Sequence, residues 1–205
     1  MFRDRREAGA KLASALRPLA SSVVMGLPRG GVVVAAEVAK AHAMPLDIVL
    51  VRKLGAPGEP ELGVGAIAEG GIEVLNTELI DLLGITDAAL DRERERQQLE
   101  LKRRNRLYRS RREPLQVANR QVILIDDGLA TGVTATAAAR SLRARGASSV
   151  VLAVPVGAPQ AVRDLSSEVD EVVCLERPVL FRAVGQWYED FRQTTDAEVL
   201  QCLRT

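Results

Sequence analysis

Short apolar runs without polar alternation recur along the chain, and segments of helical periodicity separate them. A strand buried on both faces has this character, whereas a half-exposed strand alternates apolar and polar positions. The runs therefore predict a parallel sheet covered by helices on both faces. They are VVMGL (23–27), LDIVLVRKL (46–54), VILID (122–126), SVVLAVPVG (149–157) and EVVCLE (171–176).

The stretches between these runs predict the covering helices. Aliphatic residues recur at helical spacing, and Gly146 stands where the helix before the fourth strand should end. Within 66–75 an EGG turn separates two short apolar runs, which predicts a β-hairpin. The predicted fold class is α/β, an open, mainly parallel twisted sheet of about five strands flanked by helices. Helices are expected at 2–19, 32–43, 77–83, 134–145, 158–165 and from Asp196 onward.

Residues 86–112 predict an additional long helix. Glutamates dominate its first part and arginines its last, which complements a helix dipole. Such an arginine cluster suits nucleic acid or phosphate, but it equally suits a solvated helix with ion pairs four residues apart. We favour the second interpretation, and the helix is also a candidate subunit contact.

The composition excludes some classes of function but does not identify one. At 205 residues the chain fits one domain with a real core. Lys and Arg number 28 against 27 Asp and Glu, so net charge indicates no nucleic-acid or membrane partner. No apolar run approaches the roughly 18 residues of a membrane span, and the charged start MFRDRREAGAKLA lacks the apolar stretch of a secretory signal. We expect a cytoplasmic protein.

Two residue types restrict the chemistry. Cys174 and Cys202 have neither metal-ligand nor redox spacing, and we interpret both as free thiols of a reduced compartment. The single histidine, His42, lies near the end of a predicted helix, where a cap or surface role is expected. One histidine cannot build a multi-histidine zinc site, and any histidine-dependent nucleophile would have to rely on this residue alone.

Unusual chemistry follows three of the predicted strands. The loops are PRGG (28–31), RKLGAPGEPE (52–61) and DDGLATGVT (126–134). Ligands of open parallel sheets collect beyond the carboxyl ends of the strands. We therefore expect these three loops to form the binding site.

The third loop has the donors and acceptors of a sugar-phosphate site. Residues 130–134 lie between a strand end and a helix start, where outward N–H groups and the helix dipole favour a phosphate. Small side chains let the anion approach, and Thr131 and Thr134 add hydroxyl donors. Ionised Asp126 and Asp127 suit sugar hydroxyls or hydrated Mg²⁺. The structural alternative is a strand that ends in two solvated aspartates capping a helix.

The stretch VILIDDGLATGVT (122–134) resembles the phosphoribosyl-pyrophosphate (PRPP) signature of the type I phosphoribosyltransferases. Both have an aliphatic strand, an acidic pair, two further residues and a loop of small residues and threonines. Gly128 departs from the family, which usually has an aliphatic residue there. The resemblance covers a core of about 23–176 in a single domain. Outside it, segments 1–20 and 177–205, one or both, would form the variable hood over the acceptor.

The resemblance implies roles for individual residues. Asp126 and Asp127 would hold the ribose and, through water, Mg²⁺. Arg29 and Gly30 would bind pyrophosphate, and the Arg29–Gly30 bond is the candidate for the family's unusual cis peptide. Arg52 and Lys53 would add positive charge against the pyrophosphate, and Lys53 joins the two aspartates as a catalytic candidate. The 5′-phosphate would bind Ala130, Thr131, Gly132, Val133 and Thr134.

Two further segments carry expectations. The glycine-rich stretch 55–71 resembles the family's mobile loop and suits a lid, with a plain surface hairpin as the alternative. Near the end of the chain, four aromatic residues could either stack on a planar base or form a small core that fixes the tail. They are Phe181, Trp187, Tyr188 and Phe191.

Together the resemblance implies a Mg²⁺-dependent phosphoribosyltransferase of nucleotide salvage. It would move ribose 5-phosphate from PRPP to a nitrogen acceptor, with a nucleobase as the first expectation, and release pyrophosphate. One alternative is a non-catalytic regulator of the same fold that senses PRPP or a nucleotide, with the arginines of 86–112 on nucleic acid. Another is a phosphoacceptor receiver domain, but that class places its acidic pair after the first strand. Dimers are common in the family, and the residues leave the oligomeric state and the acceptor open.

Overall fold

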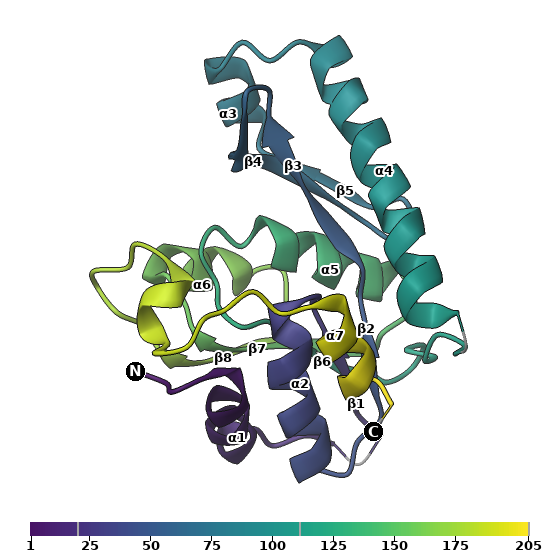
Figure 1. Cartoon of the computed structure of the whole chain (residues 1–205), viewed down its shortest axis with the longest axis vertical. Helices are drawn as coiled ribbons and strands as arrows, with labels where there is room; N and C mark the ends of the chain where they lie inside the picture. Colours follow the sequence, from purple (N-terminus) through teal and green to yellow (C-terminus); the bar gives the residue numbers. More distant parts are fainter. Residues whose placement is uncertain (20, 111, 205) are drawn as a thin grey trace.

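The computed structural model describes residues 1–19, 21–110 and 112–204. Positions 20, 111 and 205, which fall in the predicted terminal segments and the predicted long helix, lie outside the described residues. In the described chain, five parallel strands form one sheet in the order β2-β1-β6-β7-β8 (Figure 1). Their bounds are Val23–Gly26 (β1), Leu46–Ile48 (β2), Gln121–Ile125 (β6), Ser149–Val156 (β7) and Glu171–Glu176 (β8).

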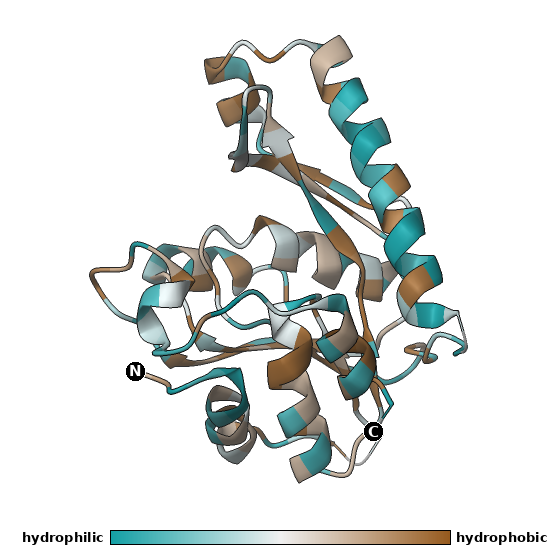
Figure 2. Ribbon diagram, in the orientation of Figure 1, coloured by the Kyte–Doolittle hydropathy of each residue, from teal (hydrophilic) through white to brown (hydrophobic). Residues whose placement is uncertain are grey.

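Helices cover both faces of this sheet, as the unbroken apolar runs predicted. Val122 and Leu124 of β6 pack with α5 (Val133–Ala144) and α6 (Pro159–Leu165), whereas Ile123 and Ile125 pack with α1 (Arg5–Ala15) and α2 (Gly30–Ala41). Successive side chains of a strand point to opposite faces. Strand β6 therefore contributes side chains to a hydrophobic core on each face of the sheet. Figure 2 shows the hydrophobic strands, in brown, between the covering helices.

A second, antiparallel sheet stands apart from the first. It consists of β3 (Val51–Ala56), β4 (Glu59–Ala68) and β5 (Glu73–Leu75), and α3 (Thr77–Leu82) and α4 (Asp87–Arg109) accompany it. These elements form a lobe that projects beside α5 (Figure 1). The predicted single strand 46–54 is therefore wrong, because the chain leaves the parallel sheet after β2 and begins another with β3. The predicted hairpin in 66–75 is confirmed as β4 and β5.

Several arginines of α4 form ion pairs with glutamates of the same helix. Glu100 accepts hydrogen bonds from Arg103 at 2.7 Å and from Arg104 at 2.8 Å, three and four residues away. Arg96 pairs with Glu93 in the same manner. These contacts fit the solvated, ion-paired helix, and the absence of a nucleic-acid partner stays a prediction. No helix within the described residues is long and apolar enough to cross a membrane.

The N-terminal segment pairs with residues 187–189 of the tail beside the parallel sheet. Phe2 N–H donates to the Trp187 carbonyl at 2.7 Å, and Glu189 N–H donates back to the Phe2 carbonyl at 2.9 Å. A short 3₁₀ helix (Val184–Trp187) precedes this pairing in the tail, and α7 (Asp196–Cys202) follows it. The N-terminal segment and the tail thus form one structural unit.

Candidate functional site

The acidic pair lies at the carboxyl end of β6, at the centre of the parallel sheet. The Asp127 N–H donates to Asp126 Oδ1 at 2.9 Å, which turns the chain sharply after the strand. Burial raises the pKa of Asp126 well above its ordinary value, and the neighbouring Asp127 charge raises it further. Burial also raises the pKa of Asp127, although Arg5 opposes that shift. Two adjacent carboxyls in this position attract cations and hydroxyl donors.

Arg5, from the first turn of α1, is the cation that meets this pair. Its Nε donates to Asp127 Oδ2 at 2.7 Å, and its Nη1 donates to the Arg192 carbonyl at 2.8 Å. The guanidinium carbon lies 4.0 Å from the ring centre of Phe191. Only 11% of the Arg5 side chain is exposed. One buried guanidinium therefore joins the start of the chain, the tail and the acidic pair.

The loop PRGG runs directly against the same two aspartates. A Cβ on Gly30 would lie 1.9 Å from Asp127 Oδ2, and a Cβ on Gly31 would lie 2.8 Å from Asp126 Cα. Glycine is required at both positions because the backbone approaches so closely. The cis peptide predicted at Arg29–Gly30 is instead found one bond earlier, between Pro28 and Arg29. The structure thus brings the first and third predicted loops together.

Arg29 extends from this loop toward the tail. Its Nη1 lies 3.9 Å from Asp196 Oδ1, and 26% of its side chain is exposed. Asp196 also accepts a short hydrogen bond from the Tyr108 hydroxyl of α4. Burial raises the pKa of Tyr108 to about 12, and its hydrogen bond to Asp196 adds to that shift. A long ion pair of this kind leaves the Arg29 guanidinium donors available for an anionic ligand.

The small-residue loop turns at Gly132 into α5. Gly132 has a left-handed φ of 80°, and α5 begins at Val133. A Cβ on Gly132 would lie 3.0 Å from Leu165 of α6, so the loop is held close to its neighbour. Ala130 and Thr131 are exposed, and Thr134 is half-buried. The first N–H groups of a helix have no intrahelical acceptors, so this turn offers donors for a phosphate.

Arg52 and Lys53 do not stand at the edge of the parallel sheet. Both lie in β3, where Arg52 pairs with Ile67 and Lys53 with Ala66 of β4. The Arg52 Nε donates to Gln97 Oε1 of α4 at 2.8 Å. The assignment of both residues to the end of a parallel strand is therefore corrected, whereas their role toward the pyrophosphate stays a prediction. Any role for them depends on the antiparallel lobe.

The glycine-rich segment 55–71 is largely paired β structure. Most of it belongs to β3 and β4, and the turn between them contains Gly58, with a left-handed φ of 83°. A Cβ on Gly55 would lie 2.6 Å from the Pro60 carbonyl oxygen, at a shift in the β3–β4 register. The expectation that glycine and proline disfavour a packed element here is wrong, because glycine permits the close approach of the strands at a bulge. Movement of the hairpin as a lid stays a prediction.

The aromatic residues of the tail form a small core. The Phe2 and Tyr188 ring centres lie 5.5 Å apart, and those of Tyr188 and Phe191 lie 5.0 Å apart. Tyr188 is only 5% exposed, and its hydroxyl donates to the Asp127 carbonyl at 2.6 Å. Phe181 and Trp187 pack against the same cluster. Of the two open interpretations, the structure supports the core that fixes the tail.

Sequence reasoning missed Arg5 and Tyr188 as residues that organise the acidic pair. Arg5 is 122 positions from its partner, and it stands in a charged start where several arginines look alike. Tyr188 could be found as one of few aromatic residues, but its backbone partner could not. Gly128, the departure from the family pattern, lies so close to the tail that a Cβ would be 2.4 Å from Val184.

The site suits a hydrated divalent cation. A single guanidinium, that of Arg5, faces the two carboxyls of the acidic pair. A bound cation could supply the second positive charge. No group of three His, Cys, Asp or Glu side chains within the described residues could hold an ion alone. Mg²⁺ commonly keeps several waters and binds one or two carboxylates together with substrate phosphates. Asp126 and Asp127 provide that donor set.

The acidic pair and the turn into α5 lie at the carboxyl edge of a parallel sheet, where ligands of open α/β folds bind. The phosphoribosyl transferase domain family matches residues 7–190, and the chain belongs to that family. It is 48% identical over 205 residues to Rv0571c of Mycobacterium tuberculosis, a protein provisionally named a phosphoribosyl transferase. The match covers 99% of this chain and 46% of that protein, so the chain spans about half the length of the curated relatives it matches.

Solved structures agree on the fold. The crystal structure of TT1426 from Thermus thermophilus superposes with a TM-score of 0.82 at 48% identity, covering 98% of this chain and 97% of that one. The AQ2163 protein from Aquifex aeolicus has a TM-score of 0.52 at 12% identity, covering 97% and 86%. The first match extends over the antiparallel lobe and both terminal segments. The lobe is therefore part of a fold that at least two proteins of this sequence class share.

Proposed function

We propose that the protein is a Mg²⁺-dependent phosphoribosyltransferase that moves ribose 5-phosphate from PRPP to a nitrogen acceptor and releases pyrophosphate. Membership of the phosphoribosyl transferase domain family supports the reaction class. The observation that carries the proposal is the contact of PRGG with the acidic pair at Gly30 and Gly31. This contact supports the proposal because the loop assigned to the pyrophosphate touches the carboxyls assigned to the ribose and the metal.

Each group has a physical task in this scheme. The turn 130–134 and the first N–H groups of α5 bind the 5′-phosphate. Asp126 and Asp127 accept hydrogen bonds from the ribose hydroxyls, and through water they would hold Mg²⁺, which supplies charge neutralisation to the diphosphate. Arg29 and the backbone at Gly30 bind the pyrophosphate. The reaction passes through an oxocarbenium-like centre, so positioning and stabilisation of the leaving group carry most of the catalysis.

A nucleobase is the first acceptor to test. The tail aromatics stack on one another and on Arg5, so they offer little ring surface for a base. Base recognition would then rely on hydrogen bonds from the polar tail. Membership of the family supports a nitrogen acceptor as the first class to test, and a screen has to identify the acceptor.

The experiment is a screen of nucleobases and simple amines with PRPP and Mg²⁺, with pyrophosphate release as the readout. The Asp126→Asn/Asp127→Asn double variant is the matched control. Calorimetry with PRPP and Mg²⁺ runs beside the screen, because a regulator of the same fold would bind PRPP without turnover. Wild-type affinity in the double variant would exclude the assignment of the acidic pair, and the absence of PRPP binding in the wild type would exclude the function.

A further inference from the structure

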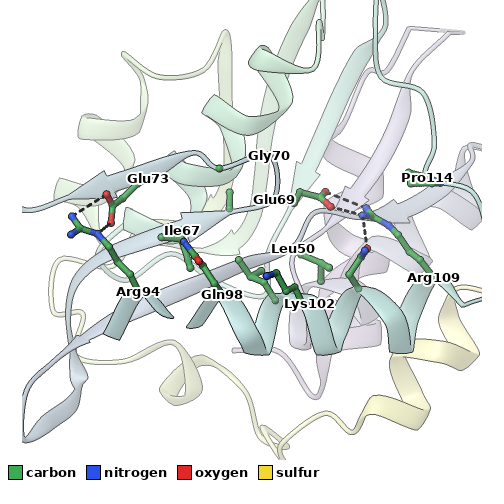
Figure 3. A pocket seen from close by; sticks show the side chains of 14 residues that line it. Leu50, Ile67, Glu69, Gly70, Glu73, Arg94, Gln98, Lys102, Arg109 and Pro114 are labelled. Carbon is green, nitrogen blue, oxygen red and sulfur yellow. Dashed lines mark hydrogen bonds and ion pairs between the residues drawn. The ribbon is translucent and has the colours of Figure 1, made fainter. Parts of the chain in front are cut away.

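A cavity of about 440 Å³ lies between α4 and the β4–β5 hairpin, in the projecting lobe (Figure 3). An ion pair connects helix and hairpin at each end of it. Arg94 Nε lies 2.6 Å from Glu73 Oε1 at one end, and Arg109 Nη2 lies 3.2 Å from Glu69 Oε1 at the other. About four turns of α4 separate the two pairs. The pairs hold the helix and the hairpin at a fixed separation.

Between the two ion pairs, α4 presents Leu101 together with polar side chains to the cavity, and the floor beneath is apolar. Leu50, Ile67 and Ala68 line the floor. Gln98 and Lys102 line the helix side, and within the described residues no hydrogen bond or ion pair is recorded for either side chain. A helix that packed tightly on this floor would present apolar side chains at those positions. The hollow is therefore a built feature of the lobe.

The turn of the hairpin borders the cavity, and Gly70 and Gly71 belong to the lining. Both have left-handed φ values, 86° and 81°, which favour glycine. A Cβ on either would meet nothing within 4 Å. The volume of the cavity falls within the range of about 300–1,000 Å³ that is usual for small-molecule sites.

The charged side chains that line the cavity indicate which class of ligand it could bind. Three cations and two carboxylates line the cavity, which leaves one positive charge unbalanced. The four charges at the two ends are paired, so the unbalanced charge is that of Lys102. Because Glu69 and Glu73 already occupy the arginines at the two ends, the described lining offers no second unpaired cation to another anionic group. A polyanion such as PRPP or a nucleotide is therefore disfavoured.

We infer that this cavity is a binding site for a small monoanionic amphipath, a carboxylic acid with an aromatic or branched aliphatic body. The body lies on Leu50, Ile67 and Leu101, where burial of its apolar surface is favourable. The carboxylate meets the Lys102 ammonium, and Gln98 donates a second hydrogen bond. The apolar floor and the single cation are the two determinants of this chemistry.

The cavity is separate from the acidic pair. Glu69, at its rim, is held by the other end of α5, because Arg145 Nη1 donates to Glu69 Oε1 at 3.0 Å and the Ser141 hydroxyl donates to the Glu69 carbonyl at 2.8 Å. The phosphate-type turn precedes the first residue of that helix, Val133. The inference therefore does not depend on the transferase reaction.

The test is calorimetric titration of the full chain with naphthylacetate, its neutral isostere naphthylacetamide, and the dianion naphthylmalonate. Naphthylacetate should bind at least about tenfold more tightly than the amide, since a charged hydrogen bond distinguishes them. Naphthylmalonate should bind no more tightly than naphthylacetate, because the described lining has no second unpaired cation for its other carboxylate.

Two variants place the binding in this cavity. Lys102→Met keeps the aliphatic stem and should weaken naphthylacetate about tenfold while leaving naphthylacetamide unchanged. Arg106→Met, on the same helix and also exposed, is the matched control and should bind like the wild type. Gln98→Trp should fill the cavity and abolish binding of both compounds without lowering the thermal midpoint of unfolding.

Three outcomes would overturn the inference. They are equal affinity for acid and amide, unchanged affinity in Lys102→Met, and no saturable binding of naphthylacetate by the folded wild type. Binding that survives Gln98→Trp would place the compound elsewhere and would also overturn it.

Discussion

The Nε of Arg5 lies 2.7 Å from Oδ2 of Asp127, although 122 residues separate them in the chain. Removal of Arg5 would leave two adjacent buried carboxyls without a cation. We expect Arg5→Met to lower the free energy of unfolding by about 3 kcal/mol, in the range seen when one partner of a buried pair is removed. Urea denaturation measures it. Arg5→Lys should restore only part of the loss, because an ammonium cannot donate along both guanidinium directions.

A double-mutant cycle isolates this pair from the rest of α1. Addition of Asp127→Asn to Arg5→Met should recover most of the lost stability, since the unpaired charge disappears. Arg6→Met is the control, because Arg6 is 60% exposed and, among the described residues, its ion pair is with Glu37 at 2.9 Å. It should change the free energy of unfolding by less than about 0.5 kcal/mol. Strictly additive losses for Arg5 and Asp127 would show that the two side chains are not coupled.

Gly30→Ala should disable the site without unfolding the protein. The new methyl group would lie 1.9 Å from Asp127 Oδ2 and 2.6 Å from Arg5 Nε, so the acidic pair or the loop must move. Displacements of about 1 Å at a reacting centre cost about 100-fold in rate. PRPP turnover measures the loss. Gly84→Asn is the control, because it lies in open space at a left-handed φ that asparagine tolerates. Wild-type turnover in Gly30→Ala would contradict the proposed geometry.

Thr131→Val tests the division between the two phosphate sites. The exposed Thr131 hydroxyl is assigned to the 5′-phosphate, which PRPP and a nucleoside 5′-monophosphate share. Loss of one hydrogen bond to a charged group should weaken both ligands by about tenfold or more. The affinity for free pyrophosphate, measured in the same calorimeter, should not change. An equal loss for pyrophosphate would show that the two sites are wrongly divided.

The β3–β4 hairpin tests the lid expectation. Its turn at Pro57 and Gly58 is exposed, and limited proteolysis should cut there in the free protein. PRPP with Mg²⁺ should protect the turn if the hairpin closes over the site to exclude water. Lys53→Ala, at the base of the hairpin, should reduce that protection. Equal cleavage rates with and without bound PRPP would identify a fixed hairpin.

Glu100 should make the stability of the lobe depend on acidity. Its hydrogen bonds from Arg103 and then Arg104 lower its pKa from an ordinary 4.5 to about 2. A depressed carboxyl pKa contributes stability that is complete above 4.5 and is lost as the pH falls toward 2. Glu100→Gln should therefore cost about 1 kcal/mol at neutral pH, a cost that shrinks through this window. Urea titrations at several pH values measure it, and Glu95→Gln, exposed on the same helix, should show no such trend.

The sequence predicted most of the parallel sheet because its signals are local. The run VILID became β6, and the acidic pair and glycines after it could be assigned to a strand end from composition alone. The split between β2 and β3 could not be predicted. LDIVLV contains no glycine, proline or polar residue where the chain changes sheets, so only tertiary packing of Val49 and Leu50 marks the change.

The site was predictable where its residues are close in sequence, and less so where they are not. Asp126, Thr131 and Gly30 lie in loops with unusual composition. Arg5 and Tyr188 reach Asp127 from opposite ends of the chain, and their partners depend on how the N-terminal segment and the tail pair. The pairing of these two segments depends on side-chain packing across the fold, and individual residues in the sequence do not reveal it.

Substitutions at Gly128 and Val184 depend on each other. The Val184 side chain occupies the space into which a side chain at 128 would project, with a separation of 2.4 Å to the first added carbon. A lineage that acquired an aliphatic residue at 128 first would pass through a clash beside the acidic pair. One that first lost bulk at 184 would pass through a cavity, which is the milder defect. A smaller residue at position 184 in the tail should therefore be acquired before an aliphatic residue at position 128.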